Sequence, residues 1–205
     1  MLKNRNRPKK NKEGSDILGR EGFEHLLGFH AAPTFTGLKP GSLLSFHRSN
    51  FQDFEGLLSS YEHCFKCKGI SVFRLVEERE FILILFYRER DLKETLEKTM
   101  AQEILSRYGY QADGSLWEKL EYLRERMRIS KSFPHEVGLF LGYPPEDVAG
   151  FIEHRGRSFS YSGYWKVYTN EEETRKLFDR YTRCTRDFCS KLDMGMKFSE
   201  LLTAG

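Results

Sequence analysis

One pair of cysteines has the spacing that metal sites and redox centres use. Cys64 and Cys67 are the only Cys-x-x-Cys pair of the chain. A redox pair of this kind opens a helix after a strand, where the helix dipole lowers the thiol pKa, whereas here a strand is expected to follow the pair. A zinc knuckle needs a second pair, and Cys184 and Cys189 would lie about 140° apart around a helix. We expect structural thiols, an exposed loop pair and no cofactor, with a metal at Cys64 and Cys67 as the weaker alternative.

His135 and Glu136 form a possible acid–base pair. A metalloprotease helix would need a second histidine at position 139, where Leu139 stands. On a strand, adjacent side chains point to opposite faces and could not share a proton. General acid–base catalysis at this pair is therefore the alternative to a polar pair in a turn. The sequence has no glycine-rich phosphate loop and no Gly-x-Ser-x-Gly elbow, which argues against dinucleotide folds, P-loop enzymes and α/β-hydrolases.

Three separated segments, 30–39, 135–143 and 164–166, share a mixture of residue types that can line a pocket. Across them, Pro and Gly shape the backbone, His and Lys offer charge, and Tyr and Trp offer flat apolar faces. Lys39 and Lys166 would favour an anionic group. The predicted ligand-binding residues are His30, Lys39, His135, Glu136, Tyr143, Trp165 and Lys166. The alternative is that the Tyr and Trp residues, including Tyr164, are core aromatics with a polar tip, and that both lysines extend outward to water.

The elements that must position these residues follow from periodicity and capping signals. Helices are predicted over about 20–30, from Asn50 through Tyr61, over 91–108, from Ser115 through Met127, over 144–154, and from Asn170 to Gly195. Strands are predicted over 42–47, 70–76, 81–87 and 161–168. The segment 32–41 is predicted to be a loop or a broken turn, and 137–141 is ambiguous between a buried strand and a helical turn.

The strongest β signal indicates a hairpin. The runs 70–76 and 81–87 are separated by four charged residues. The second run is apolar at every position, so both of its faces should be covered and it should be a central strand. Strands and helices do not alternate strictly. We predict an α+β fold: a single domain with a mixed or mainly antiparallel sheet, a central apolar hairpin strand and packed helices.

Charge is unevenly distributed along the chain. Residues 1–12 carry six Lys or Arg and no acid, so the net charge of +3 leaves 3 − 6 = −3 for residues 13–205. We expect a disordered basic tail over 1–20 and one domain over 21–205. The tail could bind phosphates, but a nucleic-acid domain should also carry a basic patch on folded elements. The nearest candidate is predicted instead to be a helix surface with ion pairs: Arg124, Arg128 and Lys131 interleaved with Glu121 and Glu125.

Nothing in the sequence suggests a membrane. The longest apolar run has seven residues, against the roughly 20 that a membrane helix needs. No apolar segment follows the basic N-terminus, so no secretory signal is expected, and the four cysteines should be reduced thiols in the cytoplasm.

The C-terminal motifs also resemble those of a known family. The segments 133–144 (FPHEVGLFLGYP) and 163–168 (GYWKVY) are similar to blocks of an uncharacterised bacterial family, a domain of unknown function typical of anaerobes. The segments 30–34 and 37–40 resemble its first block, and the resemblance spans about 25–205. It implies no established activity. It implies that relatives often have Cys at the positions of Ala31 and Ser162, so this chain would lack part of any thiol site there.

The leading hypothesis is a non-catalytic cytoplasmic binding or accessory protein. Its partner would be a small ligand, anionic if the lysines face it, or another protein. A second hypothesis is an enzyme that uses His30, His135 and Lys166 in an unrecognised arrangement. A third is a nucleic-acid binder that uses the basic tail.

Overall fold

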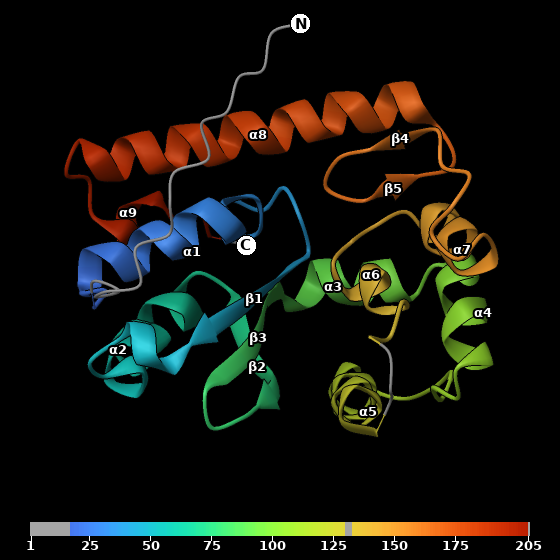
Figure 1. The fold of residues 1–205 in the computed structure, drawn as a ribbon, viewed down its shortest axis with the longest axis horizontal. Helices are drawn as coiled ribbons and strands as arrows, with labels where there is room; N and C mark the ends of the chain where they lie inside the picture. The colour runs from blue at the N-terminus through green and yellow to red at the C-terminus, as the bar shows by residue number, and fades with distance from the viewer. Residues whose placement is uncertain (1–16, 130–132, 205) are drawn as a thin grey trace, which may run out of the picture.

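Three antiparallel strands form the central sheet. The computed structural model describes residues 17–129 and 133–204. Its strands are β1 (Gly41–His47), β2 (Ile70–Glu77) and β3 (Phe81–Arg88), in the order β1-β3-β2. The hairpin of β2 and β3 and the central place of β3 are therefore confirmed (Figure 1).

Both faces of β3 are covered, as its continuous apolar run predicts. Ile82, Ile84 and Phe86 belong to one buried cluster, and Leu85 and Tyr87 belong to another on the opposite face. Successive side chains of a strand point to opposite faces, so one strand contributes to two cores.

The first core lies between the sheet and a helical layer. This layer consists of α1 (Arg20–Phe35), α2 (Phe54–Cys67), the long α8 (Glu171–Asp193) and α9 (Phe198–Leu201); a 3-10 turn, η1 (Arg48–Asn50), follows β1. Phenylalanine rings dominate the packing. Phe35 alone contacts the rings of Phe65, Phe86, Phe188 and Phe198, with centroids 5.7–6.4 Å apart. Aromatic pairs at this spacing stabilise a core beyond the area that they bury.

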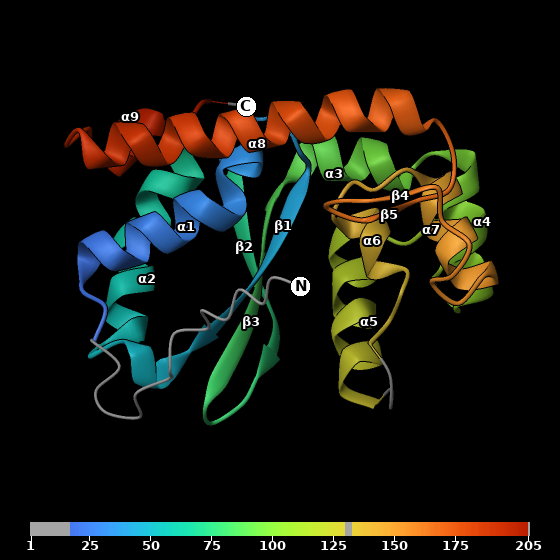
Figure 2. The same cartoon turned by 45° about the horizontal axis from the view of Figure 1, so that its top comes forward.

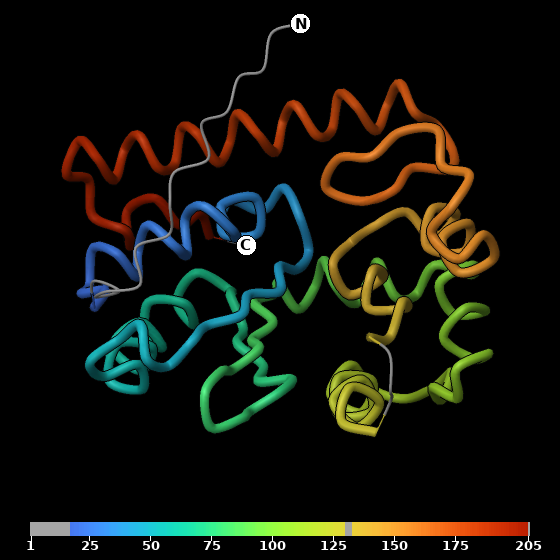
Figure 3. Tube along the Cα trace, viewed as in Figure 1, coloured from blue at the N-terminus to red at the C-terminus, as the bar shows by residue number. Residues whose placement is uncertain are grey.

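The segment 89–167 follows the sheet, and its helices pack against the other face. It contains α3 (Glu89–Leu96), α4 (Thr99–Arg107), α5 (Leu116–Ile129), α6 (Val137–Phe140), α7 (Pro145–Glu153) and the two-stranded hairpin of β4 (Tyr161–Ser162) and β5 (Lys166–Val167). A third buried cluster joins this hairpin to α8. Figure 2 shows α8 running past α1 and the three-stranded sheet and on over the β4–β5 hairpin. Figure 3 shows the path of the chain through these elements. The protein is an α+β domain, as predicted.

A buried arginine joins the ends of two helices to the C-terminal segment. Arg88 is 3% exposed, and burial lowers its pKa. Its guanidinium donates to the carbonyls of Thr34, Phe35, Thr203 and Lys68, at 2.7, 2.7, 2.9 and 3.2 Å. One side chain therefore holds the end of α1, the end of α2 and the C-terminal segment together.

Two helix predictions are wrong. The first helix does not end near residue 30 but continues through Pro33 to Phe35, because Ala31, Ala32 and Phe35 are fully buried against the sheet. The helix predicted over 91–108 is in fact two helices: α3 begins at Glu89, and residues 97–98 separate it from α4. The break lets the apolar faces of both helices reach the same core.

The strand predicted over 161–168 is also wrong. It is the β4–β5 hairpin, which turns at Gly163, whose N–H donates to the carbonyl of Trp165. A Cβ on Gly163 would lie 2.4 Å from the ring of Phe178, so this turn needs glycine for close packing. The ambiguous segment 137–141 contains the helical turn α6.

Capping is predicted correctly at some ends only. Ser115 and Glu118 form the reciprocal capping box, and α7 begins at Pro145. However, α2 is capped by Asp53 rather than by Asn50, and Asn170 is left-handed, with no side-chain cap on α8. These differences reflect the path of the preceding loop, which sequence spacing does not specify.

The predicted basic tail lies mostly outside the described residues. Leu18 already bridges Phe51, and α1 starts at Arg20, so structure begins slightly before residue 21. On α5, Arg124 and Arg128 pair with Glu121 and Glu125, as expected for an ion-paired helix surface. No helix within 17–129 and 133–204 is long and apolar enough to cross a membrane.

Candidate functional site

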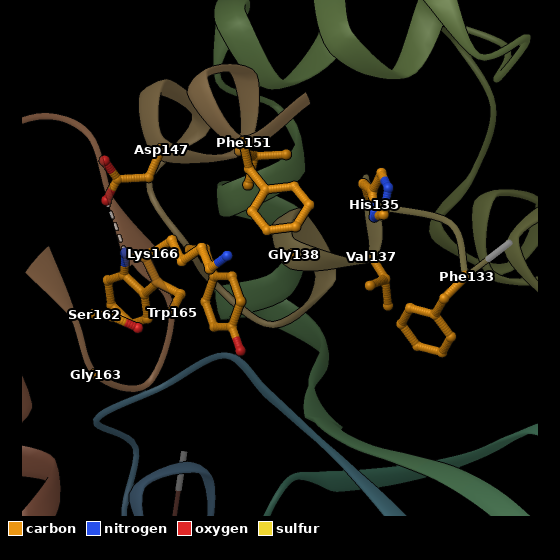
Figure 4. A pocket seen from close by; sticks show the side chains of 12 residues that line it. Phe133, His135, Val137, Gly138, Asp147, Phe151, Ser162, Gly163, Trp165 and Lys166 are labelled. Carbon is orange, nitrogen blue, oxygen red and sulfur yellow. Dashed lines mark hydrogen bonds between the residues drawn. The ribbon is translucent and has the colours of Figure 1, made fainter. Parts of the chain in front are cut away.

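A cavity of about 260 Å³ opens beside α6, α7 and the β4–β5 hairpin (Figure 4). Its lining is mostly apolar and aromatic, with a few polar side chains. It consists of Phe133, His135, Val137, Gly138, Tyr143, Asp147, Val148, Phe151, Ser162, Gly163, Trp165 and Lys166. Two of the three segments singled out in the sequence, 135–143 and 164–166, therefore meet at one concave surface.

Asp147 joins the two walls of this cavity. It stands in the first turn of α7 and is 2% exposed. Its Oδ2 accepts from Trp165 Nε1 at 2.7 Å. Its Oδ1 accepts from the backbone N–H groups of Tyr168 and Thr169, at 2.8 and 3.0 Å, and from the Thr169 hydroxyl at 3.3 Å. One carboxylate thus fixes the orientation of Trp165 and the path of the chain after β5.

An aromatic stack forms one wall. The rings of Tyr143 and Trp165 are stacked, with centroids 4.6 Å apart, and Phe178 packs edge-on against Trp165 at 4.5 Å. Lys39 Nζ lies 5.5 Å from the centre of the Tyr143 ring, a cation–π distance. Burial lowers the pKa of Lys39 to about 8 and raises the pKa of Tyr143. Lys39 therefore touches a residue of the lining without being part of the lining itself.

Two further polar side chains flank Phe151. Lys166 Nζ donates to the carbonyl of Gly156 at 2.6 Å and lies 5.7 Å from the Phe151 ring centre. The His135 ring packs edge-on against the same ring, with centroids 4.9 Å apart. The ammonium and the imidazole are therefore separated by less than about 11 Å, the sum of these two distances. Both can reach one small molecule.

The remaining predicted ligand residues lie elsewhere. Glu136 turns into the interior, where it pairs with Arg126 and accepts from Tyr110 at 3.3 Å. His30 is exposed on α1 beside Phe29 and does not line the cavity. The structure thus brings together His135, Tyr143, Trp165 and Lys166, places Lys39 next to them, and leaves Glu136 and His30 outside.

The cysteine pair lies on a helix, which corrects the expectation of a loop pair. Cys64 is half-buried and Cys67 is exposed at the end of α2, with Cys67 Sγ 3.5 Å from His63 Nε2. Burial raises the pKa of the Cys64 thiol, which disfavours the thiolate that binds metals. In the described part of the chain, no three His, Cys, Asp or Glu side chains converge in a geometry that could hold a metal.

Two important residues of the site were not predicted. Asp147 stands where acids commonly favour the first turn of a helix, so the sequence gives no sign that it also accepts a hydrogen bond from a distant tryptophan. Phe151 follows it by four residues and so lies on the same face of α7. That spacing placed both on one face, but only the folded chain shows that this face meets β5.

The fold and the cavity define an α+β protein with an aromatic, lysine-bearing pocket in its C-terminal half. The chain belongs to the family described as "Protein of unknown function (DUF3793)", whose family model matches residues 27–202. No curated protein and no solved structure gave a significant match to it.

Proposed function

We propose that the protein is a non-catalytic, cytoplasmic binding protein that holds a small molecule in the cavity beside α7. The observation that supports this most directly is the lining itself. Apolar and aromatic walls with a few fixed polar groups are the usual composition of a ligand site. The four cysteines are free thiols, which fits a reducing compartment.

The size of the cavity limits the ligand. A dry protein cavity of roughly 150 Å³ accommodates benzene. At about 260 Å³, this one has room for a single ring or a small fused ring system with one substituent. The aromatic side chains of the lining, which are Phe133, Tyr143, Phe151 and Trp165, favour an aromatic body.

The polar groups support binding more than catalysis. Asp147 is occupied by four donors, and Lys166 already donates to a backbone carbonyl. Among the described residues, no two titratable side chains of the lining hydrogen-bond to each other as a nucleophile and its base would.

Native mass spectrometry of the gently purified protein tests the proposal. We expect an additional mass that corresponds to a small bound molecule and that disappears on denaturation. Ser162 is exposed on β4 and lines the cavity, so Ser162→Phe should fill the site and remove the additional mass.

The matched control is Ser59→Phe, at an exposed position of α2 outside the cavity, which should keep the additional mass. A bound molecule that persists in folded Ser162→Phe would refute binding at this site. A wild-type protein that carries no bound molecule and binds no one- or two-ring aromatic compound would refute the proposal as a whole.

A further inference from the structure

We infer that the cavity selects flat aromatic carboxylates, and that Lys166 is the residue that pairs with the carboxylate. This inference rests on the proposed function and adds the class of ligand to it. It follows from three observations: the position of the Lys166 ammonium, the hydrogen bonds that already occupy the Asp147 carboxylate, and the backbone conformation of the segment that binds Lys166.

The Lys166 ammonium is placed for a ligand inside the cavity. It leaves β5 and extends toward Phe151, with Nζ 5.7 Å from that ring centre and 4.9 Å from the ring centre of Phe159 (Figure 4). One of its three N–H groups donates to Gly156. An ammonium has no acceptor capacity, so its two other N–H groups need acceptors from water or a ligand. Within 17–129 and 133–204, Lys166 makes no ion pair with a carboxylate.

Asp147 does not neutralise Lys166 directly. The two side chains point in opposite directions, and the Asp147 carboxylate faces the ring nitrogen of Trp165 (Figure 4). Both of its oxygens are occupied by donors from β5 and the residues after it. Asp147 thus has its own hydrogen-bond partners, and among the described residues Lys166 has no carboxylate partner.

The backbone that receives the Lys166 hydrogen bond is locally strained. Arg155 and Ser158 have positive φ angles of 51° and 55°, which are uncommon for residues other than glycine, and Gly156 lies between them at 69°. Such conformations cluster at ligand sites, where surrounding contacts hold them. Here the Gly156 carbonyl fixes the ammonium over the cavity.

The chemistry of a single lysine indicates a carboxylate. One ammonium balances one negative charge, whereas a phosphate dianion is usually held by several donors or a bidentate arginine. Lys39 lies against Tyr143 outside the lining, so Lys166 is the lysine that lines the cavity.

Matched ligand sets test the inference by calorimetry. One set is indole-3-acetate, indole-3-acetamide and tryptamine, and the other is phenylacetate, phenylacetamide and phenethylamine. We expect the wild-type protein to bind each carboxylate at least about 10-fold more tightly than its amide, the usual scale of one charge-assisted hydrogen bond. The amines should bind most weakly.

Three variants assign the preference to a residue. Lys166→Gln is polar but carries no charge, so the preference for carboxylate over amide should fall below about twofold. Lys166→Arg should retain most of it. Lys39→Met, which removes a cation beside the same stack, should leave the preference within about threefold of that of the wild type.

The possible failures are distinguishable. Equal binding of carboxylate and amide by the wild type would overturn the inference and leave the proposed function standing. A preference that survives in Lys166→Gln, or that disappears only in Lys39→Met, would overturn the role of Lys166. If no member of either set binds the wild type and it carries no bound molecule, both proposals fail.

Discussion

Replacing Asp147 by asparagine should destabilise the protein strongly, although the side chain keeps its shape. Asparagine offers one acceptor oxygen and one NH₂ group. If its oxygen retains the backbone N–H groups of Tyr168 and Thr169, its NH₂ faces the ring N–H of Trp165, and two donors meet where 2.7 Å now separates donor from acceptor. Flipping the amide moves the conflict to the backbone groups instead.

The magnitude follows from the contacts that are lost. Losing one hydrogen bond to a charged acceptor costs roughly 1.5–3 kcal/mol, and a buried N–H left without a partner costs roughly 1–3 kcal/mol more. We therefore expect Asp147→Asn to lower the free energy of unfolding by about 2.5–6 kcal/mol. For a chain of this length, that corresponds to a fall of roughly 5–24 °C in Tm.

Urea denaturation followed by far-UV circular dichroism measures this effect. The matched control is Asp113→Asn, at an exposed loop position, which should change stability by less than about 0.5 kcal/mol. A double-mutant cycle isolates the contact. In a Trp165→Phe background no ring N–H remains, so Asp147→Asn should cost at least about 1 kcal/mol less. A cost below about 1 kcal/mol, or the same cost in both backgrounds, would refute the reasoning.

Four further predictions concern other parts of the chain. Lys39 has a pKa of about 8 when folded and 10.5 ordinarily, so the unfolded chain binds more protons between these values; the stability gained by Lys39→Met should be largest below pH 8 and shrink toward pH 10.5 in urea titrations. Arg88→Met removes the guanidinium from four backbone carbonyls, of which those of Thr34 and Phe35 keep a backbone N–H donor, and should cost about 3–5 kcal/mol in the same assay, with Arg88→Lys intermediate. Elemental analysis should find well under one zinc or iron per chain, and a stoichiometric metal lost in Cys64→Ser would contradict this. Deleting residues 1–15 should lower Tm by less than about 5 °C, and any salt-sensitive nucleic-acid binding should disappear with them.

The sequence predicted elements whose signals are local. The run 81–87 is apolar at every position, which requires cover on both faces, and it is the central strand. The helix starts predicted at Ser115 and near residue 144 depend only on neighbouring residues: Ser115 forms a capping box with Glu118, and α7 begins at Pro145. The limits of such signals appear at Pro33, where burial of the surrounding residues outweighs the local preference to end the helix.

The candidate site was predicted in part for the same reason. Residue types alone indicated that His135, Tyr143, Trp165 and Lys166 could line a pocket, and these four do lie around one cavity. Glu136 was predicted to line the pocket on the same grounds, but its side chain turns inward to Arg126. Adjacent residues of a tight turn diverge, so sequence proximity could not show which of them faces the cavity.

Tertiary structure alone decided the contacts that give the cavity its chemistry. Asp147 accepts hydrogen bonds from residues 18–22 positions later, and Lys39 meets Tyr143 from the other half of the chain. The turn at Gly163 needs glycine because Phe178 of α8 approaches it too closely for a side chain. The spacing of apolar residues and the capping of helices depend on residues within one or two helical turns of each other, so the sequence can predict them. The pairing of a carboxylate with a particular indole depends on how α7, β5 and α8 pack, which is a property of the whole folded chain.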